Sequence, residues 1–184
     1  LYVPGEPTRS RWAFRGKRKD VRVYFSAANN PSAEKSLQAV RKVPQLRRAG
    51  GEGQPFEVAP VPAPSESDAS AVFAIHLVRD TFRGEGGARL AAEVTAAQGA
   101  GLRLLLLHEN DPAAGGAELS VCLATAPDEL ALATVPTVAL HPFPFHELSC
   151  CLVLQALGAC KVGTVQPDWQ SAFLATPTDA KDDK

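Results

Sequence analysis

The chain has 184 residues, of which 45% are hydrophobic and 21% are charged. This length accommodates one domain with its own hydrophobic core, with or without short extensions. The ordinary apolar content argues against a wholly disordered chain. No run approaches the roughly 20 consecutive apolar residues that a membrane-spanning helix needs, so we expect no membrane span.

The net charge of −1 hides an uneven distribution along the chain. Residues 1–50 carry 12 Lys and Arg against 3 Asp and Glu, whereas residues 51–184 carry 7 against 17. We expect the densest basic cluster to contact an anionic partner. This cluster comprises Arg15, Lys17, Arg18 and Lys19. An acidic protein, a nucleic acid bound by residues 9–19, or the acidic remainder of the same chain would each neutralise it.

The first residues and the cysteines bear on the cellular location. No Met begins the chain, and its start lacks the charged and apolar regions of a signal peptide. We therefore expect a segment of a longer intracellular protein, in the cytoplasm. The four cysteines form no C-x-x-C pair, which is typical of reduced, partly buried thiols. They are Cys122, Cys150, Cys151 and Cys160.

The first third of the chain predicts an arm, a strand and a helix. Residues 1–19 are expected to be a basic, irregular arm because prolines and glycines interrupt them. Residues 21–25 are β-rich and predict the first strand. A helix follows, with Asn30 as its N-cap and Pro31 as its first residue. Residues 56–58 alternate among prolines, which favours an edge strand or an extended loop.

The remainder alternates apolar strands with helices. Three further strands are predicted at residues 71–78, 102–107 and 135–140. Two further helices are predicted at residues 88–98 and 145–157, the first after a turn at residues 84–87. Gly99 and Gly158 are placed just beyond the ends of these helices, where a left-handed residue is favoured.

This alternation predicts a parallel sheet covered by helices on both faces. Right-handed crossovers make it a doubly wound α/β fold, and five such strands favour the flavodoxin-like order 2-1-3-4-5. We place the domain at residues 20–160, with residues 161–184 as a polar C-terminal extension. Trp12, Trp169 and Phe173 lie outside the predicted sheet and are expected to dock on the domain or on a partner.

Three phrases carry a family resemblance: residues 104–116 (LLLLHENDPAAGG), residues 125–130 (TAPDEL) and residues 155–159 (QALGA). With the five-strand pattern, they resemble Toll/interleukin-1 receptor (TIR) domains. The similarity is to divergent TIR-like modules within large multidomain proteins of microbial eukaryotes, over roughly residues 20–160. The family implies one of two roles. Many TIR domains associate with one another as signalling or scaffold modules, and some cleave the N-glycosidic bond of NAD.

The resemblance also implies site residues. The enzymes of the family use a glutamate on the helix after the third strand, and Glu93 holds that position here. Ser26 and the loop after the first strand would then border the nicotinamide pocket. The family usually has Ser, Cys or Trp four residues before this glutamate, where this chain has Arg89. From the residues alone, the alternative is an exposed ion pair between Arg89 and Glu93.

Two other groups of residues are candidates. His108, Glu109 and Asp111 follow a buried strand, and the carboxyl ends of parallel strands commonly bind ligands. The alternative is that this segment only caps a turn. His146 and Cys150 lie one helical turn apart and could face one zinc ion, or simply pack in the core. No complete metal site is predicted.

We therefore predict a TIR-like interaction or scaffold module that binds other protein domains or itself, without a cofactor. The first alternative is an NAD glycohydrolase or cyclase that uses Glu93. The second is contact with nucleic acid through the basic arm.

Overall fold

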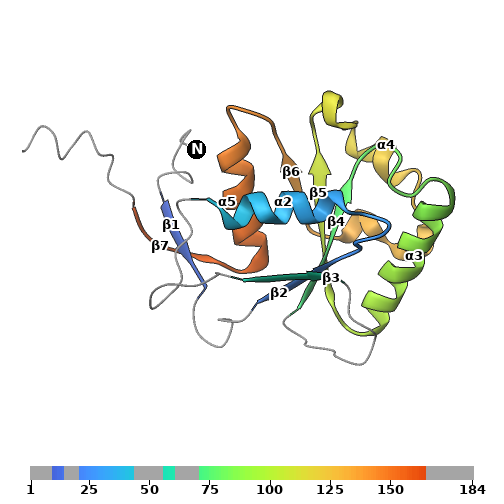
Figure 1. The fold of residues 1–184 in the computed structure, drawn as a ribbon, viewed down its shortest axis with the longest axis horizontal. Coiled ribbons are helices and arrows are strands. Elements are labelled where there is room, and N and C mark those ends of the chain that lie inside the picture. Colours follow the sequence, from blue (N-terminus) through green and yellow to red (C-terminus); the bar gives the residue numbers. More distant parts are fainter. Residues whose placement is uncertain (1–9, 15–20, 44–55, 61–70, 165–184) are drawn as a thin grey trace, which may run out of the picture.

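The computed structural model describes residues 10–14, 21–43, 56–60 and 71–164. Its centre is a five-stranded sheet in which every neighbouring pair is parallel, with the order β3-β2-β4-β5-β6 (Figure 1). The strands are β2 (Arg22–Phe25), β3 (Glu57–Pro60), β4 (Val72–Leu77), β5 (Arg103–Glu109) and β6 (Thr137–Leu140). Counted along the chain, this is the predicted order 2-1-3-4-5. The fold class is therefore the expected doubly wound, flavodoxin-like α/β fold.

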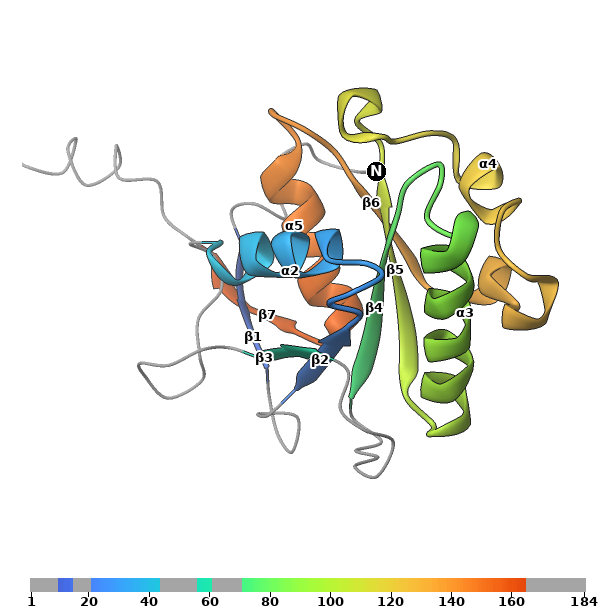
Figure 2. The same ribbon diagram turned by 45° about the vertical axis from the view of Figure 1, so that its right-hand side comes forward.

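Helices cover both faces of the sheet (Figure 2). One face carries α2 (Ser32–Arg41) and α5 (His146–Leu157), and the other carries α3 (Gly84–Gly99) and α4 (Leu119–Leu123). Three short 3-10 turns lie between β5 and β6: η2 (Pro112–Ala114), η3 (Asp128–Leu130) and η4 (Leu132–Thr134). The sheet is thus the middle layer of three.

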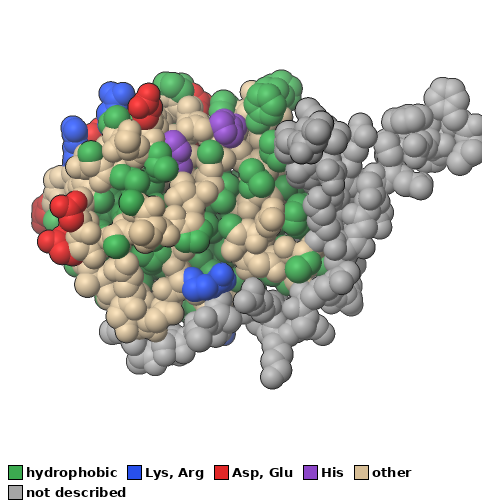
Figure 3. Space-filling view, turned by 180° about the vertical axis from the view of Figure 1, so that it is seen from behind, with side chains coloured by type: hydrophobic (Ala, Val, Ile, Leu, Met, Phe, Trp, Pro, Cys, Tyr) green, Lys and Arg blue, Asp and Glu red, His purple; other side chains and the backbone are tan. Residues whose placement is uncertain are grey.

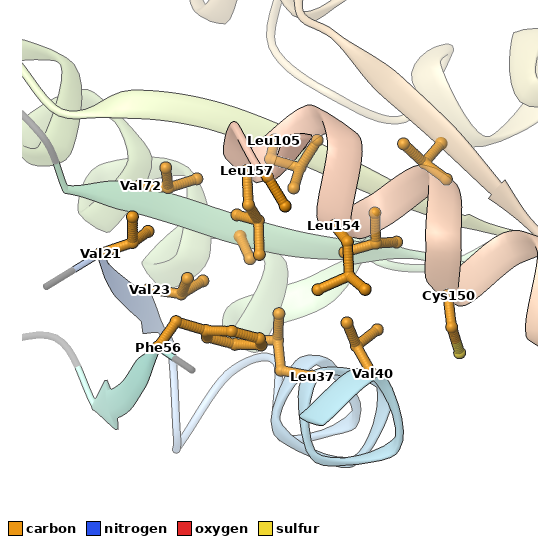
Figure 4. Close-up of a cluster of buried hydrophobic side chains, with 14 of the residues drawn as sticks. Val21, Val23, Leu37, Val40, Phe56, Val72, Leu105, Cys150, Leu154 and Leu157 are labelled. Atoms are coloured by element: carbon orange, nitrogen blue, oxygen red, sulfur yellow. The ribbon is translucent and has the colours of Figure 1, made fainter. Parts of the chain in front are cut away.

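Alternation along the strands divides the hydrophobic core into two parts. Val72 and Ala74 of β4 face α2 and α5, whereas Phe73 and Ile75 face α3. All six residues of β4 are buried, which explains the continuous apolar run of that segment. Figure 4 shows the first part, in which side chains from the strands meet those of α2 and α5. Its labelled members include Val23, Leu37, Val40, Leu154 and Leu157.

The first residue of α3 and the glycine that follows its end both differ from the sequence prediction. Helix α3 begins at Gly84, so residues 84–87 form its first turn rather than a separate turn. A Cβ on Gly87 would lie 2.1 Å from the carbonyl carbon of Phe82, so glycine is needed there for close packing. The left-handed glycine beyond this helix is Gly101, with φ of +78°, and not Gly99. The C-terminal prediction for α5 is confirmed, because Gly158 has φ of +100°.

The predicted N-cap of α2 is also wrong. Pro31 occupies the N-cap position, and the side chain of Asn30 bonds elsewhere. Its Oδ1 accepts from the backbone N–H of His76 at 2.8 Å, and its Nδ2 donates to the His76 carbonyl at 2.9 Å. Asn30 therefore ties the loop after β2 to β4 instead of capping its own helix.

The basic arm is not irregular throughout. Strand β1 (Ser10–Ala13) pairs antiparallel with β7 (Cys160–Thr164) in a separate two-stranded sheet. Trp12 is only 3% exposed and belongs to the core beneath α2 and α5, together with Phe14. The structure corrects the predicted arm at residues 10–13 and the predicted extension at residues 161–164, because burial of these aromatic rings holds both segments against the domain. The docking expected of Trp12 is thus observed on its own domain.

Several predictions concern residues outside the described part. These are Trp169, Phe173 and the basic cluster of Arg15, Lys17, Arg18 and Lys19. Among the described helices, none is long and apolar enough to cross a membrane. All four cysteines are described and free, with Cys122, Cys150 and Cys151 buried and Cys160 exposed. Partly buried free thiols are what the cysteine pattern predicts.

The burial of Trp12 predicts a large effect of its removal on stability. Trp12→Ala is expected to lower the free energy of unfolding by about 3–5 kcal/mol, because it empties a large site in the core. Val121→Ala is the control: Val121 is 41% exposed, so the change is expected to stay within about 0.5 kcal/mol. Chemical denaturation of both variants measures this. Equal effects of the two substitutions would contradict the placement of Trp12.

Candidate functional site

A cavity of about 410 Å³ opens at the carboxyl ends of β4, β5 and β6, between α2 and α5. This is the edge of an open α/β sheet at which ligands commonly bind. Its ionisable lining residues are Lys35, His76, Glu109, Asp111, His141, His146 and Cys150. Its remaining residues are two serines of α2 and small or apolar side chains, so the cavity combines apolar walls with a few polar groups.

His76 and Glu109 are the most buried polar pair in this lining. Nε2 of His76 lies 3.4 Å from Oε2 of Glu109, and the two side chains are 6% and 14% exposed. The other carboxylate oxygen of Glu109 accepts from the backbone N–H of Asp111 at 2.8 Å. Burial lowers the pKa of His76, which outweighs the opposing effect of Glu109. At neutral pH His76 is therefore a neutral imidazole.

The second ring nitrogen of His76 is unusual. Nδ1 is buried and has no hydrogen-bond partner among the described residues. The backbone around it is fully bonded, because the His76 carbonyl accepts from Asn30 and, at 3.2 Å, from the Thr81 hydroxyl. Sequence reasoning missed His76 as a site residue, since it lies within an apolar run. The signal that could have identified it is a single histidine within an otherwise apolar predicted strand.

The predicted cluster after β5 is divided by the sheet. Glu109 and Asp111 line the cavity, but His108 points to the opposite face, where its Nε2 lies 2.7 Å from the Ala117 carbonyl oxygen. The prediction that all three bind one ligand is wrong for His108, because consecutive residues of a strand face opposite sides. Asp111 also caps η2, with its Oδ1 accepting from Ala113 N–H at 2.9 Å. The turn-capping alternative therefore holds for Asp111.

The two glycines that end the HENDPAAGG phrase have separate structural reasons. Gly115 has φ of +87°, a conformation that other residues adopt only under strain. A Cβ on Gly116 would lie 2.6 Å from the Glu109 carbonyl oxygen and 2.7 Å from that of Asp111. The backbone thus doubles back against the residues that carry the two cavity carboxylates. This phrase is compact because its glycines permit close approach of the backbone.

His146 and Cys150 do lie together. Sγ of Cys150 is 3.6 Å from Nε2 of His146, and both line the cavity. Burial raises the pKa of Cys150 to about 12, so it is a neutral thiol rather than a thiolate at neutral pH. Within the described residues, no group of three or more His, Cys, Asp or Glu side chains is placed to hold a metal ion.

Glu93 lies on α3 and does not line this cavity. Its Oε1 accepts from the Asn29 side-chain amide at 2.8 Å, and the Asn29 backbone N–H donates to the Ser26 hydroxyl at 3.1 Å. Its Oε2 is buried without a partner among the described residues. Arg89 pairs with Glu85 rather than with Glu93, so the expected ion pair is absent. Asn29 thus links Glu93 to Ser26, the two residues that the TIR resemblance singles out.

An apolar surface adjoins the cavity. Phe143 and Phe145, in the loop between β6 and α5, are 92% and 58% exposed. Leu152 of α5 is also exposed. Figure 3 views the molecule from the side opposite to Figure 1, where hydrophobic and uncharged side chains fill the middle and most charged ones lie at the margins. Exposed aromatic rings are frequent anchors of protein contacts, so the loop that carries Phe143 and Phe145 is a candidate contact site.

Comparisons with known proteins identify no family for this chain. No family model and no curated protein matches the chain. Among solved structures, an oxidised flavodoxin from Bacillus cereus is similar at 13% identity and a TM-score of 0.34. The match covers 75% of this chain and 95% of the flavodoxin. The fold class rests on the strand order and pairing described above.

The close approach at Gly116 predicts the effect of adding a methyl group. Gly116→Ala is expected to lower the free energy of unfolding by about 1–3 kcal/mol, because backbone atoms must move to admit the Cβ. Gly86→Ala is the control. A Cβ there meets nothing within 4 Å, so the change is expected to stabilise α3 by about 0.4–1 kcal/mol. Thermal or chemical denaturation measures both, and two changes of the same sign would contradict this account of the turn.

Proposed function

We propose that this chain is a TIR-like protein–protein interaction module that associates with a second copy of itself. The observation that carries the proposal is the exposure of two phenylalanines in one loop, Phe143 and Phe145. Aromatic rings of this kind are frequent anchors in protein interfaces. The family resemblance adds that TIR domains commonly associate with one another.

The loop that carries these rings is held in place by the domain. The backbone N–H of His141 donates to the Ser149 hydroxyl of α5 at 2.9 Å. The rings of His141 and Phe145 lie edge to face, with centroids 6.4 Å apart. A loop that is already ordered loses less conformational entropy on binding than a free one. These contacts therefore favour a preformed contact surface.

The division of charge favours a second copy as the partner. The first 50 residues carry nine more basic than acidic residues, and the other residues carry ten more acidic than basic ones. Two copies arranged head to tail would bring opposite charges together, which promotes encounter and selects the partner. We therefore propose that the surface around the two phenylalanines contacts a second copy of the chain. The oppositely charged segments of the two copies would promote their encounter.

The proposal predicts self-association that depends on the two rings. Wild-type protein is expected to show a mass that rises with concentration in sedimentation equilibrium. The double substitution of Phe143→Ser and Phe145→Ser is expected to leave a monomer, because it removes the apolar anchors. Raising the salt to about 1 M, where the Debye length is about 3 Å, is expected to weaken association by the wild type.

Val121→Ser is the matched control, since Val121 is an exposed apolar residue of α4 that lies away from this loop in the sequence. It is expected to associate as the wild type does. A wild type that remains monomeric at all concentrations would refute self-association, and so would a double variant that associates normally.

A second function, cleavage of NAD by Glu93, is favoured by one specific observation. A carboxylate oxygen of Glu93 is buried without a described partner, while the other is oriented by Asn29 next to Ser26. In such a reaction the bond between the ribose C1′ and nicotinamide breaks, and water adds to C1′. A fixed carboxylate would stabilise the positive charge that develops on the ribose.

This candidate predicts release of nicotinamide that requires the carboxylate. Glu93→Gln is expected to abolish turnover of NAD, measured by chromatography, because the amide keeps the shape and the contact with Asn29 but lacks the charge. Glu85→Gln, on the exposed face of the same helix, is expected to retain the wild-type rate. Equal rates in the wild type and in Glu93→Gln would exclude Glu93 as the catalytic residue.

A further inference from the structure

We propose that the cavity at the carboxyl ends of β4, β5 and β6 binds a small amino-acid-type molecule, with its ammonium group at Glu109 and His76 and its carboxylate at Lys35. The lining of this site includes neither Phe143 and Phe145 nor Glu93. The site therefore goes beyond both functions proposed above.

The acidic end of the cavity lacks a cation. The Glu109 side chain is only 14% exposed, and among the described residues the basic group paired with it is His76. Among the described residues, no Lys or Arg forms an ion pair with Glu109 or with Asp111, which lies beside it. A buried carboxylate is costly unless a cation or several hydrogen-bond donors satisfy it. A ligand ammonium group supplies a positive charge and three donors.

The buried imidazole is the second observation that points to a ligand. His76 lines the cavity, is more than nine-tenths buried, and keeps Nδ1 without a partner. With Nε2 directed at the Glu109 carboxylate, the proton belongs on Nε2, and Nδ1 is a buried acceptor that no described residue satisfies. The Glu109 carboxylate, held beside this imidazole, is the acceptor that the lining offers to a hydrogen-bond donor.

A basic residue also lines the cavity. This residue is Lys35 of α2. It forms no ion pair with any described residue. Ser32 and Ser36 also line the cavity, one turn apart on the helix. The Ser36 hydroxyl donates to the Ser32 carbonyl at 3.2 Å, so the Lys35 ammonium and the Ser32 hydroxyl are the donors that suit a carboxylate ligand group.

The space between these ends suits an apolar body. Ala39 and Val40 of α2 contribute to the apolar part of the lining, together with Leu140 and Pro142, and the volume is about 410 Å³. This lies within the range of about 300–1,000 Å³ that is typical of small-molecule sites. The lining thus fits a molecule with an ammonium group, a carboxylate and an apolar side chain.

Calorimetric titration of the whole chain tests the proposal with L-phenylalanine, L-leucine and L-glutamine as probes. At least one of the three is expected to bind. For L-phenylalanine, two truncated probes separate the two ends: phenethylamine lacks the carboxylate and 3-phenylpropanoate lacks the ammonium group. Each is expected to bind at least about tenfold more weakly than L-phenylalanine, because a charge-assisted contact is lost.

Two variants with matched controls place the ligand. Glu109→Gln is expected to weaken binding of the tightest probe at least about tenfold, whereas Glu118→Gln, an exposed carboxylate nearby in the sequence, leaves it unchanged. Lys35→Met is expected to weaken binding similarly, and Lys42→Met, at the end of the same helix, is expected to have no effect. None of the four substitutions is expected to alter self-association.

Three results would overturn the proposal. One is that no amino acid binds the wild type. Another is that 3-phenylpropanoate or phenethylamine binds as tightly as L-phenylalanine. This comparison uses only the wild-type protein, so it does not depend on whether Glu109→Gln folds. The third is that a folded Glu109→Gln, with its thermal transition retained, binds the tightest probe as the wild type does.

Discussion

The side chain of Asn30 makes the contact on which both candidate sites depend. Strand β2 pairs with β4 only at Val23 and Tyr24, so the two strands lack paired residues toward the carboxyl edge. There the Asn30 amide bonds both backbone groups of His76, at 2.8 and 2.9 Å. A buried side-chain amide thus takes the place of a strand beside β4. It fixes the end of β4 and the loop after β2 in one arrangement.

This arrangement places one group of polar residues on each face of the sheet. On the side of α2 and α5, the end of β4 presents His76 to Glu109. On the side of α3, the same loop after β2 brings Asn29 to Glu93. Because consecutive strand residues face opposite sides, His108 belongs to neither group and satisfies its ring on the Ala117 carbonyl. The two sites therefore share a support but no side chain.

Hydrophobic patterning predicted four of the strands and the two long helices near their observed bounds, and it left residues 56–58 as an edge strand or an extended loop. The predicted strand order came from the order that such five-stranded sheets favour. Hydrophobic patterning could not reveal which polar groups meet, since that depends on pairing between segments far apart in the chain. Asn30 was predicted to cap its helix, a local role, but bonds a strand 46 residues away. His76 was hidden in an apolar run, and Trp12 lay in a stretch whose prolines and charges predict an arm. In each case tertiary contacts overrode a local signal.

The segment between β6 and α5 has two roles at once. His141 and Pro142 close one side of the cavity, and Phe143 and Phe145 form the exposed apolar surface immediately after them. The Ser149 hydroxyl, which accepts from His141 N–H, and the packing of His141 against Phe145 hold this segment on α5. A ligand shifts a partner's affinity only if it favours one conformation over another. Because both contacts hold the segment on α5, we expect the proposed binding in the cavity to leave the proposed association at the phenylalanine surface unchanged.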